Sequence, residues 1–199
     1  MNLPNKITIS RIGLAFLFMA AVSGRWYIAA GFVFIVAVIT DAIDGELARK
    51  LGCVTDFGKL MDPIADKILI SAAFISLSQM GSPVLKPWCL PLWMVVVIIS
   101  REFLITGLRL LAASENTVLE AGKLGKHKML SQSIAIAVIL IILALSDQKF
   151  PALQNAFESY SFVFSTLVYL LMLVAVFFTV ASGSLYLYEN KNLFSEKKA

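Results

Sequence analysis

The chain has 199 residues, of which 59% are hydrophobic and only 15% are charged, and its formal net charge is +4. Soluble domains are about 45–50% apolar and roughly 25% charged, so this composition excludes an ordinary soluble protein and predicts an integral membrane protein. The length suits one compact helical bundle, a single domain over residues 1–199. Two cysteines are too few for a disulfide framework.

Six apolar stretches are candidates for membrane spans, each of which needs about 20 residues. The breaks between them contain Gly, Pro, Ser and charged residues, as in "VSGRW" and "MGSPVLKP". The sequence therefore predicts an all-α membrane protein with six transmembrane helices, and "NLPNKITISR" as a short amphipathic helix at the membrane surface that leads into the first. The expected spans are 11–24, 26–44, 61–80, 88–112, 129–146 and 160–188.

Lysine and arginine are divided unequally between the two sides of the predicted membrane. Of the 17 basic residues, only Arg25, Lys86 and Lys149 fall on one side. Loops on the cytoplasmic side of membrane proteins carry the excess of Lys and Arg. We therefore expect a multi-pass protein of the inner (cytoplasmic) cell membrane, with both termini facing the cytoplasm.

Two arginines lie inside a predicted span rather than in a loop. Arg101 and Arg109 are two helical turns apart in "VVVIISREFLITGLRLLAA", so they share roughly one face of the helix. An ionisable residue within a span is by default a functional hypothesis with a partner to be named. We expect Glu102 to pair with Arg101 or with a neighbouring basic residue.

Four aspartates lie where two predicted spans meet the cytoplasmic side. Asp41 and Asp44 are spaced i,i+3 and Asp62 and Asp66 are spaced i,i+4, so each pair projects from one face of its helix. A carboxylate within a membrane costs at least ~2.5 kcal/mol, and four of them that converge would repel one another. Divalent cations relieve that repulsion, and oxygen ligands favour Mg²⁺, Mn²⁺ or Ca²⁺ over Zn²⁺. A site with two such metals is suited to displacement at phosphorus.

Small residues accompany the aspartates. Gly45 follows Asp44 directly and Gly58 precedes Asp62 by one helical turn, so both positions let a ligand approach the helix backbone. Ala48 is also small, and Arg49 can bind a phosphate with its planar guanidinium. The alternative for any one of these small residues is helix–helix packing, a common role of Gly and Ala in membranes.

The whole stretch reads Asp41-x2-Asp44-Gly45-x2-Ala48-Arg49-x8-Gly58-x3-Asp62-x3-Asp66. It resembles, without departure, the signature of the CDP-alcohol phosphotransferase family. Three other segments, "NLPNKITISRIGLAF", "REFLITGLRLLA" and "AGKLGKHK", are similar to the bacterial phosphatidylglycerophosphate synthase branch of that family. The resemblance implies six transmembrane helices, usually in a homodimer, that transfer a phosphatidyl group from a CDP-linked donor to an alcohol and release CMP.

The resemblance also implies roles for individual residues. Asp41, Asp44, Asp62 and Asp66 would hold two ions of Mg²⁺ or Mn²⁺, and Asp66 would be the general base for the acceptor hydroxyl. The residues implied to bind the CDP donor, CDP-diacylglycerol, are Asn5, Thr8, Gly45, Ala48, Arg49, Thr55 and Gly58.

The acceptor is inferred from the basic residues downstream of the signature. A free alcohol needs no anion site, whereas a phosphorylated acceptor does, and guanidinium and ammonium groups supply one. The choice of glycerol 3-phosphate over inositol phosphate rests on the resemblance of "REFLITGLR" alone. The residues expected to bind the acceptor phosphate are Arg101, Arg109, Lys123, Lys126 and Lys128.

Three alternatives remain open. The first is another member of the family that uses inositol phosphate, phosphatidylglycerol (to make cardiolipin) or serine as acceptor. The second is a divalent-cation transporter, which would place its carboxylates near the membrane centre on broken helices, whereas these lie beside Arg49 and Lys50 at one end. The third is a membrane scaffold without activity, against which the intact signature argues. No nucleic-acid partner is expected.

Overall fold

The computed structural model describes residues 3–51, 56–86, 90–114, 124–147 and 151–191. Within the helices, the side chains of residues 3–8, 41–51, 56–63, 66, 114, 124 and 151–153 lie outside the description, as does that of Pro83. The described part contains only helices and the connections between them, and no strand. Its elements are α1 (Leu3–Ser23), α2 (Tyr27–Leu51), α3 (Asp56–Ser78), the 3₁₀ turn η1 (Pro83–Leu85), α4 (Leu92–Ser114), α5 (Leu124–Leu145), α6 (Pro151–Ser159) and α7 (Ser161–Glu189).

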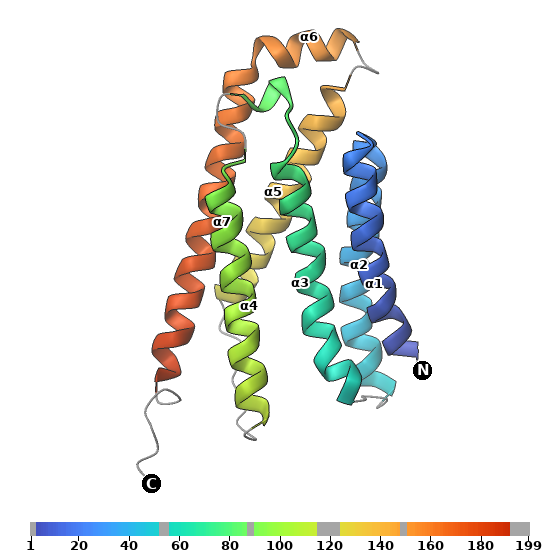
Figure 1. The fold of residues 1–199 in the computed structure, drawn as a ribbon, viewed down its shortest axis with the longest axis vertical. Coiled ribbons are helices and arrows are strands. Elements are labelled where there is room, and N and C mark those ends of the chain that lie inside the picture. The colour runs from blue at the N-terminus through green and yellow to red at the C-terminus, as the bar shows by residue number, and fades with distance from the viewer. Residues whose placement is uncertain (1–2, 52–55, 87–89, 115–123, 148–150, 192–199) are drawn as a thin grey trace.

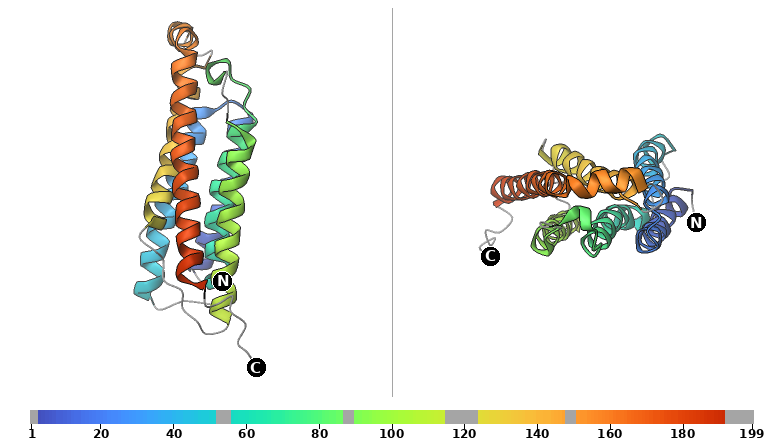
Figure 2. Two further views of the ribbon diagram at one scale, coloured as in Figure 1. Left: turned by 90° about the vertical axis from the view of Figure 1, so that its left-hand side faces the viewer. Right: turned by 90° about the horizontal axis from the view of Figure 1, so that it is seen from above.

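The long helices run alternately up and down along one axis (Figure 1). α6 lies across one end of the bundle, and the start of α1 and the end of α7 lie at the other (Figures 1 and 2). α1 packs against α2 and α3, α5 packs against α7 and α2, and α4 packs against α3 and α7. The end of α2 and the start of α3, which carry the four aspartates, therefore lie at the end away from α6.

The outward surface of the helices is apolar, as a protein surrounded by lipid requires. Many large apolar side chains are exposed, whereas contiguous apolar patches are small on soluble monomers. Five of those that are more than 60% exposed illustrate the pattern. They come from four different helices: Phe16, Phe32, Leu111, Phe162 and Phe177. By length and composition, two stretches of the described chain could cross a membrane, Gly125–Leu145 and Ser161–Glu189. Three further apolar stretches are shorter: Ile9–Ser23, Tyr27–Thr40 and Lys67–Ser78.

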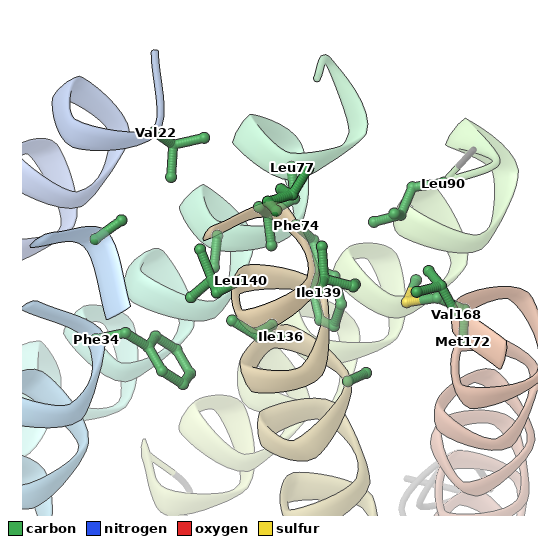
Figure 3. Packing of buried hydrophobic residues seen from close by; sticks show 14 of the residues in the cluster. Val22, Phe34, Phe74, Leu77, Leu90, Ile136, Ile139, Leu140, Val168 and Met172 are labelled. Atoms are coloured by element: carbon green, nitrogen blue, oxygen red, sulfur yellow. The ribbon is translucent and has the colours of Figure 1, made fainter. Parts of the chain in front are cut away.

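The main apolar core joins most of the helices near the α6 end and the middle of the bundle (Figure 3). Phe34 of α2, Phe74 of α3, Ile136 and Ile139 of α5 and Met172 of α7 are at most 4% exposed and belong to this one cluster. In lipid, close packing rather than exclusion of water favours association of such surfaces. The core therefore fixes how α2, α3, α5 and α7 stand relative to one another.

A second, smaller cluster joins α1, α2 and α3 beside the aspartates. It consists of Ala15, Ala37, Leu69 and Ala72. Small residues allow helix backbones to approach closely. Ala37 precedes Asp41 by one turn and Leu69 follows Asp66 by about one turn, so this contact holds the aspartate-bearing turns of both helices against the same helix, α1.

Two features differ from the expected elements. The expected surface helix at "NLPNKITISR" and the first span form one continuous helix, α1. The helix α6 was not expected from the sequence; it begins at Pro151, and proline is favoured in the first helical turn. Its Phe157 stacks on Phe164 of α7, with ring centres 4.4 Å apart.

Candidate active site

The four signature aspartates lie on helical backbone, as expected. Asp41 and Asp44 are in α2, and Asp62 and Asp66 are in α3. Their side chains lie outside the described residues, and the expected metal site stays a prediction. Among the side chains that are described, no group of three or more His, Cys, Asp or Glu gathers as a metal site would require. Four carboxylates at the same end of the bundle are nevertheless a donor set of the kind that Mg²⁺ and Mn²⁺ prefer.

The residues expected to bind the CDP donor are distributed over the same end of the bundle. Asn5 and Thr8 lie in the first turns of α1, and the other members described by their backbone lie near the end of α2 or the start of α3. The contacts of these side chains lie outside the description, as does Thr55 altogether. The helices thus bring the elements together, while the roles of the residues stay predictions: Gly45, Ala48, Arg49, Thr55 and Gly58.

Four of the five residues expected to bind the acceptor phosphate line one cavity of about 260 Å³. Arg101 and Arg109 enter it from α4, and Lys126 and Lys128 enter it from α5. The fifth, Lys123, lies outside the described residues. The expectation that Arg101 and Arg109 share a helix face is confirmed by their common cavity.

The cavity also contains a cation that the sequence analysis did not place there. Lys67 of α3 lines it, and it follows Asp66 directly in the sequence. Its position directly after the signature residue Asp66 was the sequence feature that could have indicated its place in the site. The cavity lining includes five basic side chains and two acidic ones, Glu102 and Glu189, so its charge favours an anion.

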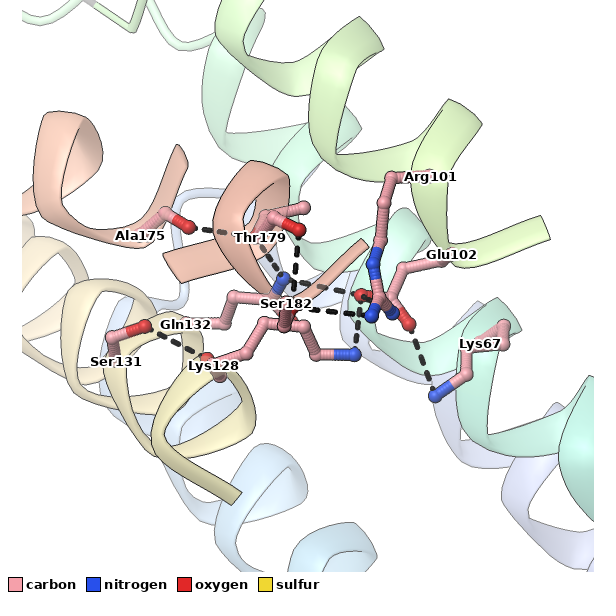
Figure 4. A network of polar contacts seen from close by, with 9 residues as sticks. All are labelled: Lys67, Arg101, Glu102, Lys128, Ser131, Gln132, Ala175, Thr179 and Ser182. Carbon is pink, nitrogen blue, oxygen red and sulfur yellow. Dashed lines mark hydrogen bonds and ion pairs between the residues drawn. The ribbon is translucent and has the colours of Figure 1, made fainter. Parts of the chain in front are cut away.

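Glu102 of α4 is the centre of a polar network in this cavity (Figure 4). Its side chain is 3% exposed, and one carboxylate oxygen lies 2.6 Å from Nζ of Lys128 while the other lies 3.2 Å from Nζ of Lys67. Arg101, the neighbour in sequence, is more distant, with 3.9 Å between its guanidinium nitrogen and the carboxylate. The expected pairing of Glu102 with a basic residue is confirmed, and its nearest partners come from α5 and α3.

The amide of Gln132 connects Glu102 to α7. Its Nε2 donates to a carboxylate oxygen of Glu102 at 3.3 Å and to Oγ1 of Thr179 at 3.0 Å. The Thr179 hydroxyl in turn donates to the carbonyl oxygen of Ala175 at 2.6 Å. Gln132 and Thr179 are both at most 2% exposed. Buried polar groups need such partners, because an unpaired group costs about 1–3 kcal/mol.

The guanidinium of Arg101 is held by the next turn of the same face of α7. It donates to Oγ of Ser182 at 3.1 Å, and its side chain passes over Gly183. A Cβ atom at Gly183 would lie 3.1 Å from Cγ and 3.1 Å from Nε of Arg101. The absence of a side chain at Gly183 therefore makes room for Arg101.

α7 is the part of the site that the sequence analysis missed. Ser182, Leu185, Tyr186 and Glu189 complete the cavity wall, and the guanidinium carbon of Arg109 lies 6.0 Å from the ring centre of Tyr186. The available signal was the interruption of an apolar helix by "TVASGS", in which polar and small residues recur on one face.

Comparison with known proteins gives a consistent family. A family model described as CDP-alcohol phosphatidyltransferase matches residues 1–181. A CDP-diacylglycerol–glycerol-3-phosphate 3-phosphatidyltransferase of Bacillus subtilis (strain 168) is 42% identical, over 95% of this chain and 95% of its own. A probable phosphatidylglycerophosphate synthase of Mycobacterium tuberculosis is 40% identical over 72% of this chain and 68% of its own. A CMP-forming cardiolipin synthase of Oryza sativa subsp. japonica is 36% identical over 76% of this chain and 48% of its own.

Proposed function

Because the chain belongs to the CDP-alcohol phosphatidyltransferase family, we propose that it transfers the phosphatidyl group of CDP-diacylglycerol to sn-glycerol 3-phosphate and releases CMP. Its relatives and its apolar helices indicate a membrane-bound transferase of phospholipid biosynthesis. The observation that carries the choice of acceptor is the cavity with five basic side chains, which borders the aspartate-bearing helix α3 at Lys67.

The aspartates would provide the donor half of the site. Enzymes of this family are generally metal-dependent, and the proposed ligands of two ions, Mg²⁺ or Mn²⁺, are Asp41, Asp44, Asp62 and Asp66. Bound divalent ions would neutralise the diphosphate of the donor and the charge that develops on departing CMP. Arg49 would add a guanidinium to the donor phosphates, and Gly45 and Gly58 would let the nucleotide approach the helices.

The reaction itself needs one base and one leaving group. The acceptor hydroxyl gives its proton to the carboxylate of Asp66 as its oxygen bonds to the donor phosphorus attached to the diacylglycerol. The bond from that phosphorus to the oxygen of CMP breaks, and CMP leaves as the anion. General-base assistance of this kind is worth about 10²–10⁴-fold in rate.

The cavity would hold the other end of the acceptor. A phosphate monoester carries close to two negative charges at neutral pH, and the basic side chains of Arg101, Arg109, Lys126 and Lys128 face the same space. Lys123 is proposed as a further contact. Lys67, which lines the cavity, and Asp66, the proposed base, are consecutive residues of α3, so we propose that an acceptor with its phosphate in the cavity has its hydroxyl near Asp66, oriented for attack.

We extend the proposal to orientation and assembly. Arg25 and Lys86 follow the helix ends near α6, whereas the basic cavity lies at the opposite end of the bundle. The excess of basic residues supports a cytoplasmic location for the cavity end and both termini. Six spans, formed by α1 to α5 and α7, and a homodimer in the inner (cytoplasmic) membrane complete the proposal.

A second candidate acceptor is phosphatidylglycerol, because the relative from Oryza sativa is named a cardiolipin synthase. Its phosphate is a diester with a single charge and has no free terminal oxygen dianion. The excess of basic side chains in the cavity favours the more highly charged monoester. Glycerol 3-phosphate therefore fits better.

The variant Asp66→Asn tests the proposed chemistry. CMP release from CDP-diacylglycerol and glycerol 3-phosphate should fall by at least about 100-fold, since the amide does not accept the proton. The matched control is Asp147→Asn, the same change just beyond the end of α5 near α6, which should keep its activity. Both proteins should elute from a sizing column like the unmodified one. Activity retained by Asp66→Asn would refute the assignment of the base.

A further inference from the structure

Glu102 is an unexpected residue for an anion site. Its carboxylate is buried among the cations of the cavity that is proposed to bind the acceptor phosphate. A negative charge next to the phosphate site repels a phosphate rather than attracting it. An ion pair that only stabilises the fold does not have to lie in a substrate cavity. The position of Glu102 therefore suggests a role in binding of the acceptor or in release of the product.

The reaction proposed above leaves the acceptor phosphate in the cavity. The new bond forms at the hydroxyl end, so the product carries the same phosphate on the same cations and must release it before another acceptor enters. A cavity whose cations had no internal anion would hold that product tightly, since charge-assisted bonds are the strong ones. Fast release requires something that replaces the phosphate on the cations.

We propose that Glu102 is a positioning residue that competes with the acceptor phosphate for Lys128 and Arg101 and so promotes release of the phosphorylated lipid product. The inference rests on the proposed function. Before the acceptor binds, the carboxylate of Glu102 holds the cations in place. When the acceptor phosphate binds, the cations contact both the carboxylate and the phosphate. When the product leaves, the cations contact the carboxylate alone again.

The geometry supports the competition. Lys128 is the closest partner of Glu102, at 2.6 Å, and Arg101 is a distant one, at 3.9 Å, whose guanidinium has a hydrogen bond to Ser182 instead. Both line the cavity, so a phosphate that enters it can take the place of the carboxylate on Lys128, while Arg101 keeps its hydrogen bond to Ser182.

The carboxylate itself is fixed from another side. Gln132 donates to it and is held by Thr179, whose hydroxyl donates to the backbone of α7. These contacts do not involve the cations, so Glu102 keeps its place when Lys128 and Arg101 turn toward a phosphate. Because Glu102 stays fixed while the cations can move, its carboxylate can compete with the phosphate for them.

The test is Glu102→Gln, which keeps the shape and one accepting oxygen but removes the charge. Inorganic phosphate is used as a competitive inhibitor against glycerol 3-phosphate in detergent micelles that contain CDP-diacylglycerol. We expect its inhibition constant to fall by on the order of tenfold and kcat to fall several-fold. A burst of CMP in the first turnover should appear, because product release becomes limiting. Glu102→Asp, which keeps the charge, should restore the inhibition constant to within about threefold of its original value.

Two results separate the possible failures. An inhibition constant that is unchanged or raised in Glu102→Gln, without a burst, would overturn the role of Glu102, because a residue that only supports the fold would lower activity without tightening phosphate. Phosphate that does not compete with glycerol 3-phosphate in the unmodified enzyme would overturn the acceptor site itself, and this inference with it. If Glu102→Gln does not fold, the same comparison is made between Lys128→Gln and the double variant Glu102→Gln/Lys128→Gln, where the inhibition constant should again fall.

Discussion

Gly183 offers a direct way to disturb the acceptor cavity without removing any charge. In Gly183→Ala the new Cβ would lie 3.1 Å from both Cγ and Nε of Arg101, so the arginine must shift by a few tenths of an ångström. That shift lengthens its 3.1 Å hydrogen bond to Ser182. Hydrogen bonds to charged groups are worth about 1.5–3 kcal/mol, and loss of about 1.4 kcal/mol is tenfold in binding. We therefore expect the KM for glycerol 3-phosphate to rise about tenfold.

The matched control is Gly31→Ala in α2, where a Cβ would meet no atom within 4 Å. Alanine is favoured over glycine in a helix by about 0.5–1 kcal/mol, so Gly31→Ala should unfold at the same temperature as the unmodified protein or higher, whereas Gly183→Ala, which weakens the hydrogen bond of Arg101 to Ser182, should unfold at the same temperature or slightly lower. Only Gly183→Ala should change the KM, measured by CMP release at saturating CDP-diacylglycerol. An unchanged KM in Gly183→Ala, or an equal rise in Gly31→Ala, would refute the assignment of Arg101 to the acceptor.

Three further outcomes are expected. Removal of divalent cations with EDTA should abolish CMP release, and either Mg²⁺ or Mn²⁺ should restore it; full activity in EDTA would contradict the metal site. Phe74→Ala should lower the free energy of unfolding by about 3–5 kcal/mol because it empties a fully buried position of the core, while Phe177→Ala, at a side chain that is 66% exposed, should change it little; thermal unfolding in detergent measures both. Gln132→Leu should cost about 1–3 kcal/mol of stability, because it leaves buried Glu102 and Thr179 with one hydrogen bond fewer; an unchanged unfolding temperature would contradict the network.

The sequence predicted much of the fold because apolar stretches and helix breakers are local signals. The expected spans at 26–44, 61–80 and 160–188 overlap α2, α3 and α7, and the all-helical class follows from the same pattern. Helix α6 was missed because it is short and polar, and its place depends on a contact with α7 through Phe157 and Phe164 that no local pattern reveals.

The candidate site could be predicted only where its residues share a helix or a motif. Arg101 and Arg109 were assigned to one site because their spacing in a single helix is fixed. The partners of Glu102 could not be chosen, because Lys67 and Lys128 come from two other helices and their distance depends on how the bundle packs. The contribution of Ser182 depends on the same long-range packing.

The choice of acceptor distinguishes glycerol 3-phosphate from the other alcohols that the family uses. The purified protein is incubated with CDP-diacylglycerol and Mg²⁺ or Mn²⁺, and CMP release is followed with glycerol 3-phosphate, inositol phosphate, phosphatidylglycerol or serine as the acceptor. We expect CMP release with glycerol 3-phosphate, together with a lipid product that retains the phosphate, and little release with the others. CMP release supported by another of these acceptors and not by glycerol 3-phosphate would refute the proposed acceptor.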